Sequence, residues 1–168
     1  APVHPTDPDR LELPRQAPAP LAAVEPQTPA MLMYTSGTTG EPKGVALSHW
    51  NMVCAGRAVV EAQAMTSADR VLSSLPLYHI NGQCIATVSP VVSGGSIVMP
   101  HRFSVSQWWP LVERYRPTWL NVVPTIIAYL LNGPQPTASQ LEAMRSVRFA
   151  RSASAPLPPE QHRAFESR

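Results

Sequence analysis

Short apolar segments alternate along this chain with longer segments that have helical spacing. The apolar segments are residues 30–35, 45–47, 71–75, 96–99, 119–123 and 147–151. Strands that alternate with helices of about ten to fifteen residues indicate an α/β fold with a largely parallel sheet. Because the segments are apolar throughout, we expect buried strands, including the one at residues 30–35, and helices on both faces of the sheet.

The helical segments are predicted between the apolar runs. They are residues 48–64, 82–92, 105–116 and 125–131, a short helix before residue 147 and a stretch after Pro158. Ser48 is a suitable N-cap for the first helix, and Gly94 and Gly95 end the second. Trp108 and Trp109 fall on the apolar face of the third, which predicts that both belong to the core.

The first 29 residues differ from the rest of the chain in their proline content. Eight of the 20 prolines lie within the first thirty residues. Such a composition is typical of a stiff, extended segment rather than a packed element. We therefore interpret residues 1–29 as an extended lead-in and residues 30–168 as the α/β domain.

Charge and composition exclude several classes of partner. The net charge of +2 is spread without a basic stripe, so neither nucleic acid nor a membrane surface is an expected partner. No apolar run is long enough to span a bilayer, and the first residues do not resemble a signal peptide. Cys54 and Cys84 lack metal-site spacing and are interpreted as small buried thiols, which fits a reducing, cytoplasmic location.

Residues 34–44 form the segment that is richest in hydrogen-bond donors, and they read YTSGTTGEPKG. Hydroxyl side chains and glycines are followed by Lys43, the only lysine of the chain. Glycines let the backbone turn its N–H groups toward a ligand, and a compact ammonium suits a phosphate group. In a Walker loop the residue after the lysine is Ser or Thr and a helix follows, whereas here Gly44 and a predicted strand follow. The segment therefore predicts a polyphosphate site of another kind.

The segment Tyr34–Gly44 resembles the signature of the adenylate-forming superfamily, and residues 48–51 resemble its usual continuation. This superfamily includes acyl-CoA synthetases, beetle luciferases and the adenylation domains of peptide synthetases. The resemblance implies that residues 30–168 are part of the large N-terminal domain of an acyl-CoA-synthetase-like fold, without its C-terminal lid domain. It also implies that the β- and γ-phosphates of ATP are held by Thr35, Ser36, Gly37, Thr38, Thr39, Gly40 and Lys43.

A second stretch, residues 75–82 (LPLYHING), resembles the family motif that ends a strand beside the acyl pocket. The resemblance implies that Tyr78 and His79 contact the substrate and that His79, the catalytic candidate, lies next to the carboxylate or acyl-adenylate. The alternative is a packed, hydrogen-bonded core histidine. Residues 103–131 resemble the family scaffold, from which Asn121 and Thr125 could touch the substrate.

A third stretch, residues 151–157 (RSASAPL), resembles the family segment whose backbone lines the adenine pocket. The residues implied are Ser152, Ala153, Ser154, Ala155 and Pro156. Ala153 stands where the family commonly has glycine, and an alanine restricts any positive φ required there. The alternative is a polar turn between a strand and a helix.

The resemblance also bears on substrate and cofactors. Members that activate amino acids usually carry an Asp after the aromatic residue of the second motif, but no acidic residue lies between Asp69 and Glu113. A carboxylic acid without an α-amine is therefore favoured, and an amino-acid adenylation domain remains the alternative. The family uses ATP, Mg²⁺ and CoA, and Mg²⁺ neutralises the phosphates during attack by the carboxylate. The family's metal ligand and catalytic lysine lie downstream of the matched region, so no metal ligand is expected in this chain.

Two functions are consistent with these motifs. The first is part of an acid–thiol ligase that forms an acyl-adenylate and then a thioester with CoA. The second is a truncated, non-catalytic module that binds nucleotide or associates with itself. Uncovered sheet edges and helix faces would favour an oligomer or a strand-swapped arrangement.

We expect the 168-residue chain alone to catalyse no ATP–pyrophosphate exchange above background. The physical reason is that the family's Mg²⁺ ligand, ribose-binding aspartate and catalytic lysine are absent from the sequence. The measurement is isotope exchange into ATP with a panel of carboxylic acids. Exchange well above background would contradict the expectation.

Overall fold

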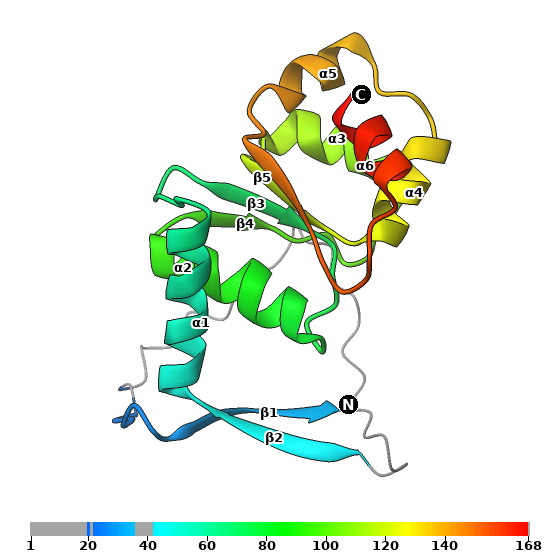
Figure 1. Cartoon of the computed structure of the whole chain (residues 1–168). Helices are drawn as coiled ribbons and strands as arrows, with labels where there is room; N and C mark the ends of the chain where they lie inside the picture. Colours follow the sequence, from blue (N-terminus) through cyan, green and yellow to red (C-terminus); the bar gives the residue numbers. More distant parts are fainter. Residues whose placement is uncertain (1–19, 21, 36–41, 168) are drawn as a thin grey trace, which may run out of the picture.

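A computed structural model describes residues 20, 22–35 and 42–167. A four-stranded parallel sheet lies at its centre, with the strand order β4-β3-β5-β6 (Figure 1). The strands are β3 (Arg70–Ser73), β4 (Ser96–Val98), β5 (Trp119–Val122) and β6 (Phe149–Ser152). The predicted α/β class with a largely parallel sheet is confirmed.

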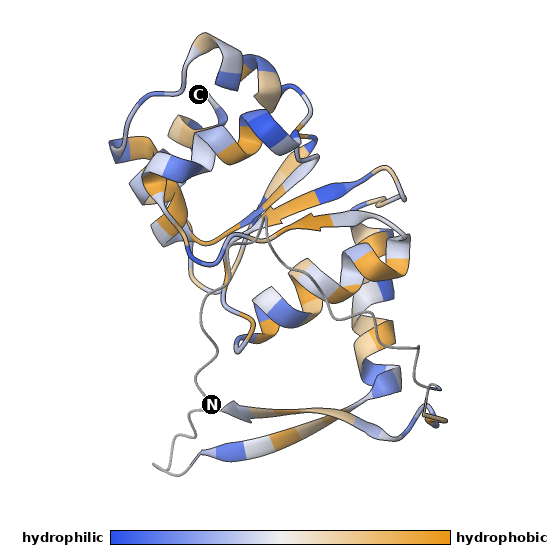
Figure 2. Ribbon diagram, turned by 180° about the vertical axis from the view of Figure 1, so that it is seen from behind, coloured by the Kyte–Doolittle hydropathy of each residue, from blue (hydrophilic) through white to orange (hydrophobic). Residues whose placement is uncertain are grey.

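Helices cover both faces of this sheet, as predicted (Figure 1). One face carries α1 (His49–Ala62), the π-helix η2 (Asn81–Val88) and α2 (Ser89–Ser93). The other carries α3 (Val105–Tyr115), α4 (Pro124–Asn132), α5 (Ala138–Met144) and α6 (Pro159–Glu166). Figure 2 shows apolar strands lying between these layers.

Successive residues of each central strand face opposite helical layers, because side chains alternate along a strand. Val71 and Trp119 pack with residues of α1 and η2, whereas Leu72 and Leu120 join the larger cluster around Trp108. All five side chains are at most 1% exposed, which explains the unbroken apolar runs in the sequence. Trp108 and its neighbour on α3 are buried, so the prediction for the two tryptophans is confirmed.

The first two strands form a separate antiparallel hairpin, β1 (Pro29–Thr35) with β2 (Lys43–Ser48). The prediction of a buried strand at residues 30–35 is wrong, since Leu32 is 56% and Tyr34 66% exposed. An apolar run indicates that a strand can be buried, but it does not identify the element that would cover it. Among the described residues, β1 pairs only with β2, and α1 packs against the hairpin at its end (Figure 1).

The predicted helix at residues 82–92 is confirmed, but it consists of two parts, the π-helix η2 and the α-helix α2. Pro90 has no N–H to donate to the carbonyl four residues earlier, so a regular α-helix cannot continue through it. The preceding residues form wider turns, and Thr87 Oγ1 donates to the Gly82 carbonyl over 2.9 Å. Gly94, with φ of 74°, ends α2 in the left-handed conformation, as predicted.

Ser48 caps α1 as predicted. Its hydroxyl accepts from the Asn51 N–H, and the Asn51 side chain accepts from the Ser48 N–H over 3.0 Å. Gly56 lets α1 approach η2 closely, because a Cβ there would lie 2.9 Å from Val88 Cγ1.

Three other predictions are tested only in part. Cys84 is buried, which raises the pKa of its thiol, whereas Cys54 is only partly buried. Within residues 20, 22–35 and 42–167, no helix is both long and apolar enough to cross a membrane. Most of the lead-in at residues 1–29 lies outside the described residues, so that boundary stays a prediction.

The edge of the sheet where the strands begin is held by the carboxylate of Asp69, which is 3% exposed. Its oxygens accept from Thr118 Oγ1 (2.7 Å), Arg148 Nη2 (2.9 Å) and the Thr66 N–H (2.7 Å). Burial is the largest single influence and raises the pKa of Asp69, but these hydrogen bonds and the Arg148 charge together lower it below 3.8. Asp69 thus ties together the starts of β3, β5 and β6.

We expect Asp69→Asn to lower the free energy of unfolding by about 2 kcal/mol, because it leaves a buried network of donors without its carboxylate. The difference from wild type should be complete above about pH 4 and disappear as pH falls through the lowered pKa of Asp69. Urea unfolding at about pH 7 and over a descending series of acidic pH values measures both effects.

The matched control is Glu142→Gln, which breaks the exposed ion pair with Arg145. It should change the free energy of unfolding by less than about 0.5 kcal/mol. Equal effects of the two substitutions at neutral pH would contradict the assigned role of Asp69.

Candidate substrate-binding site

Polar residues lie side by side where three strands of the parallel sheet end. Ser73 of β3 pairs with Asn121 of β5, which in turn pairs with Arg151 of β6. Each lies two positions after an apolar residue on the α1 and η2 face of the sheet, so all three belong to that face. Ligands of open parallel sheets gather at this carboxyl-terminal edge.

Asn81, the first residue of η2, connects this row into a hydrogen-bond network. Asn121 Nδ2 donates to Ser73 Oγ and to Asn81 Oδ1, both over 3.3 Å. Arg151 Nη1 donates to Asn81 Oδ1 over 3.1 Å and to Asn121 Oδ1 over 3.4 Å. Asn81 Nδ2 donates to Ser154 Oγ over 3.4 Å. The network joins β3, β5 and β6 to η2 and to the segment after β6.

Arg151 is half-buried in this network, and burial lowers the pKa of its guanidinium below its ordinary value. The group stays charged at neutral pH, because arginine starts from so high a value. Its acceptors are amide oxygens, and no ion pair links it to an acidic residue in the described part of the chain.

His79 lies beside the network, in the loop between β3 and η2. Its side chain is exposed, so the alternative of a packed core histidine is wrong. Nδ1 accepts a hydrogen bond from the Asn81 N–H over 3.1 Å. In the neutral ring the proton is therefore on Nε2, which is available as a donor. Tyr78 is 85% exposed and lies in the same loop.

Gly82 brings the start of η2 against the loop that carries His79. A Cβ at this position would lie 2.4 Å from the Pro76 carbonyl oxygen and 2.8 Å from that of Leu75. No real Cβ tolerates such distances to backbone atoms, so only glycine allows this approach. The sequence stretch at residues 75–82 therefore folds into one compact unit with His79 and Asn81 on it.

The segment implicated in adenine binding follows the row directly. Ser152 ends β6, and its buried hydroxyl has no hydrogen-bond partner among the described residues. The positive φ falls at Ser154 (75°) and not at Ala153, so the predicted restriction at Ala153 does not arise. Residues 154–156 are exposed. The small, exposed residues 154–156 leave room for a flat ligand such as adenine.

The phosphate segment is described only at its two ends. Thr35 and Lys43 are paired residues of the β1–β2 hairpin, and Thr35 Oγ1 donates to the Lys43 carbonyl over 3.4 Å. The predicted strand after the segment is confirmed. The other implicated residues, Ser36, Gly37, Thr38, Thr39 and Gly40, lie outside the described residues.

The structure brings some of the predicted residues together and leaves others apart. His79, Asn121 and Ser154 meet through Asn81. Asn121 is fully buried, so any influence on a ligand passes through its partners. Thr125 is exposed in the first turn of α4 and joins no hydrogen bond of the network. In the described ranges no group of three or more His, Cys, Asp or Glu side chains could hold a metal ion.

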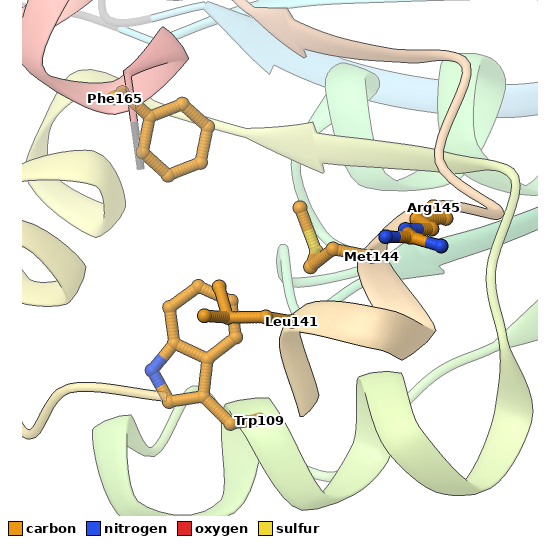
Figure 3. Close-up of a pocket in the computed structure, with 5 residues that line it drawn as sticks. All are labelled: Trp109, Leu141, Met144, Arg145 and Phe165. Carbon is orange, nitrogen blue, oxygen red and sulfur yellow. The ribbon is translucent and has the colours of Figure 1, made fainter. Parts of the chain in front are cut away.

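Two hollows differ in their relation to this network. One, of about 540 Å³, lies at the ends of β3 and β4 and is lined by residues 74–78 and 99–103. The other, of about 360 Å³, lies between α3, α5 and α6, where Phe165 faces Trp109 and Leu141 (Figure 3). Its lining is apolar except for Arg145, which pairs with Glu142. Of these two hollows, the first is the one that the loop of His79 adjoins.

Sequence reasoning missed Ser73, Asn81 and Arg151 as members of the site. Ser73 and Arg151 did carry a signal, because each is a polar residue inside or directly after an otherwise apolar strand. Asn81 carried no such signal, since its partners are 40 and 70 positions away.

Comparisons with known proteins identify the family and the fold. The profile of the AMP-binding enzyme family matches residues 2–168. A sulfoacetate–CoA ligase of Cupriavidus necator is 54% identical over 99% of this chain, which covers 33% of that protein. An oxalate–CoA ligase of Arabidopsis thaliana is 34% identical over 80% of this chain and 26% of its own length.

Among solved structures, a malonyl-CoA ligase in a ternary product complex with methylmalonyl-CoA and AMP is similar to this chain. It is 30% identical with a TM-score of 0.76, over 88% of this chain and 32% of that one. The chain thus spans about a third or less of the length of these relatives.

We expect Gly82→Ala to lower the free energy of unfolding by about 1–3 kcal/mol, because the new methyl group forces η2 away from two carbonyl oxygens. Gly44→Ala is the control for stability, since its Cβ would meet only side chains, those of Leu32 at 3.3 Å and Tyr34 at 3.6 Å. Thermal unfolding of both variants is the measurement. A Gly82→Ala variant as stable as Gly44→Ala would show that the close approach is not required.

Proposed function

The chain belongs to the family of AMP-binding enzymes, and on this premise we propose that the whole protein is an acid–thiol ligase. A carboxylate oxygen of the substrate attacks the α-phosphorus of ATP, which forms an acyl-adenylate and releases pyrophosphate. The thiolate of CoA then attacks the acyl carbon, which forms the thioester and releases AMP. The observation that supports this most directly is the 54% identity to a CoA ligase along nearly the whole chain.

The β1–β2 hairpin is the proposed grip for the phosphates of ATP. Lys43 supplies a positive charge at the start of β2, where it pairs with the hydroxyl-bearing Thr35 at the end of β1. Backbone N–H groups and hydroxyls of the connecting residues complete the grip, namely Ser36, Gly37, Thr38, Thr39 and Gly40. Charge-assisted hydrogen bonds of this kind are shorter and stronger than neutral ones. The grip holds the nucleotide while its α-phosphorus is attacked.

The segment after β6 is the proposed contact for adenine, through Ser152, Ala153, Ser154, Ala155 and Pro156. The small, exposed residues 154–156 support this role. The bond from Asn81 to Ser154 helps to hold the unfavourable positive φ of that serine.

His79 is the proposed catalytic residue. With Nδ1 engaged by the Asn81 N–H, Nε2–H can donate to the carboxylate and orient it for attack. Tyr78 and Thr125, both exposed, are the proposed further contacts of the acyl group, and Asn121 positions Asn81 and Arg151.

Mg²⁺ and CoA complete the reaction. Mg²⁺ neutralises phosphate charge when bound, and its ligands would come from parts of the whole protein outside the described residues. No residue of this chain is assigned to CoA.

The cytoplasmic location and self-association of the chain stay predictions, the latter supported by the exposed apolar side chains of the hairpin.

The charge of the site favours an acid over an amino acid. Residues 70–112 contain no carboxylate that could pair with an α-ammonium group, which argues against an amino-acid adenylation domain. The acids named for two relatives, sulfoacetate and oxalate, are small and carry a second ionised group. We therefore propose small acids of this kind as the first substrates to test.

We expect the whole protein to release AMP and pyrophosphate from ATP in the presence of CoA and a small carboxylic acid. Lys43→Ala should raise the KM for ATP about ten- to a hundredfold, because a charged hydrogen-bond donor to phosphate is lost. Arg163→Ala on α6 is the matched control and should leave this KM unchanged. If neither AMP nor pyrophosphate appears with any of a panel of carboxylates, the proposed function is wrong.

A further inference from the structure

Arg148 and Arg151 lie at opposite ends of β6, and they differ in the groups that accept their hydrogen bonds. Arg148, at the start of β6, forms an ion pair of 2.9 Å with the buried carboxylate of Asp69. Arg151, at the other end of β6, has only the amide oxygens of Asn81 and Asn121 as acceptors, and both bonds come from Nη1. Its remaining donors form no hydrogen bond with the described part of the chain. The guanidinium therefore keeps donors for another group.

Among the described residues, no carboxylate forms an ion pair with Arg151. Between residues 70 and 159 the acidic residues are Glu113 and Glu142. Glu113 lies in the last turn of α3 and Glu142 in α5, helices that lead into the starts of β5 and β6. Both therefore belong to the opposite edge of the sheet, where Asp69 also lies.

A partly buried cation without a counter-ion is costly, because desolvation is not compensated by an opposite charge. Within the part of the chain that the structure describes, Arg151 makes no ion pair that would offset this cost, in contrast to Arg148. A planar guanidinium with free donors matches a carboxylate or sulfonate that accepts two hydrogen bonds. The arrangement is thus suited to an anion that arrives with the ligand.

We propose that Arg151 binds a second anionic group of the acid substrate, so that the site selects short acids with two negative charges. The inference rests on the proposed function, since it concerns the acid that is activated. Arg151 is a specificity-determining residue, and Asn81 and Asn121 hold its guanidinium in place through Nη1.

Asn81 also explains why the acid should be short. Its N–H holds His79, which is proposed to orient the reacting carboxylate, and its side-chain oxygen holds Arg151. The two recognition groups are therefore linked through a single residue. An acid that contacts both can have only a short chain between its two charged groups.

The test compares substrates that differ in charge and little in shape. The whole protein, wild type and Arg151→Gln, is assayed for AMP release with sulfoacetate and with methylsulfonylacetate, in which a methyl group replaces one sulfonate oxygen. We expect wild type to prefer sulfoacetate in kcat/KM by about ten- to a hundredfold, the range of a charged hydrogen-bonded contact. Arg151→Gln should lower kcat/KM for sulfoacetate about ten- to a hundredfold more than kcat/KM for methylsulfonylacetate, which removes the preference.

Two further variants separate recognition from structure. Arg151→Lys keeps the charge without the planar fork and should retain part of the preference. Arg148→Gln, which breaks the pair with Asp69, should lower thermal stability but keep the preference for sulfoacetate. Thermal unfolding of each variant identifies losses that come from misfolding.

The inference is overturned if wild type does not distinguish the two acids, or if Arg151→Gln lowers activity equally with both. Absence of AMP release with every acid would contradict the proposed function instead. In that case calorimetric titration with sulfoacetate decides the inference by itself: binding that Arg151→Gln abolishes supports it, and absence of binding or equal binding by both proteins overturns it.

Discussion

The parallel register of β3, β5 and β6 is the constraint on which the rest of this structure depends. Asp69 connects Thr118 and Arg148 at the edge where these strands begin. A few residues later the same register places Asn121 between Ser73 and Arg151. A slip of one residue in any strand would turn its side chains to the other face of the sheet. It would break the buried anchor at one edge and the polar row at the other.

The buried charges at the two edges of the sheet therefore have different kinds of partner. At the starting edge a carboxylate and a guanidinium neutralise each other, and the pKa of Asp69 is lowered accordingly. At the ending edge the side-chain acceptors of Arg151 among the described residues are the neutral amide oxygens of Asn81 and Asn121. The first arrangement favours stability, and the second leaves an unsatisfied positive charge beside the proposed catalytic histidine.

The local approach of η2 is what joins this charge to His79. Gly82 allows the helix to start directly against the backbone of residues 75–76, and Pro90 prevents it from continuing as a regular α-helix. Unusual helix geometry is often found at functional sites, where it aims a side chain that an ideal helix would point elsewhere. Here the residue so placed is Asn81, which contacts the loop, the sheet and the segment after β6.

The sequence by itself determined the α/β class, the two buried tryptophans, the Ser48 cap and the stretches that carry the proposed site, because these depend on local periodicity and on the chemistry of single residues. It did not determine that residues 30–35 pair in an exposed hairpin, that Pro90 divides a helix, or that the positive φ falls at Ser154. Only the tertiary structure decided that Asn81 meets Arg151, 70 positions away, with no carboxylate between them. The physical reason is that strand register and close backbone approach depend on contacts between distant segments, which no local pattern encodes.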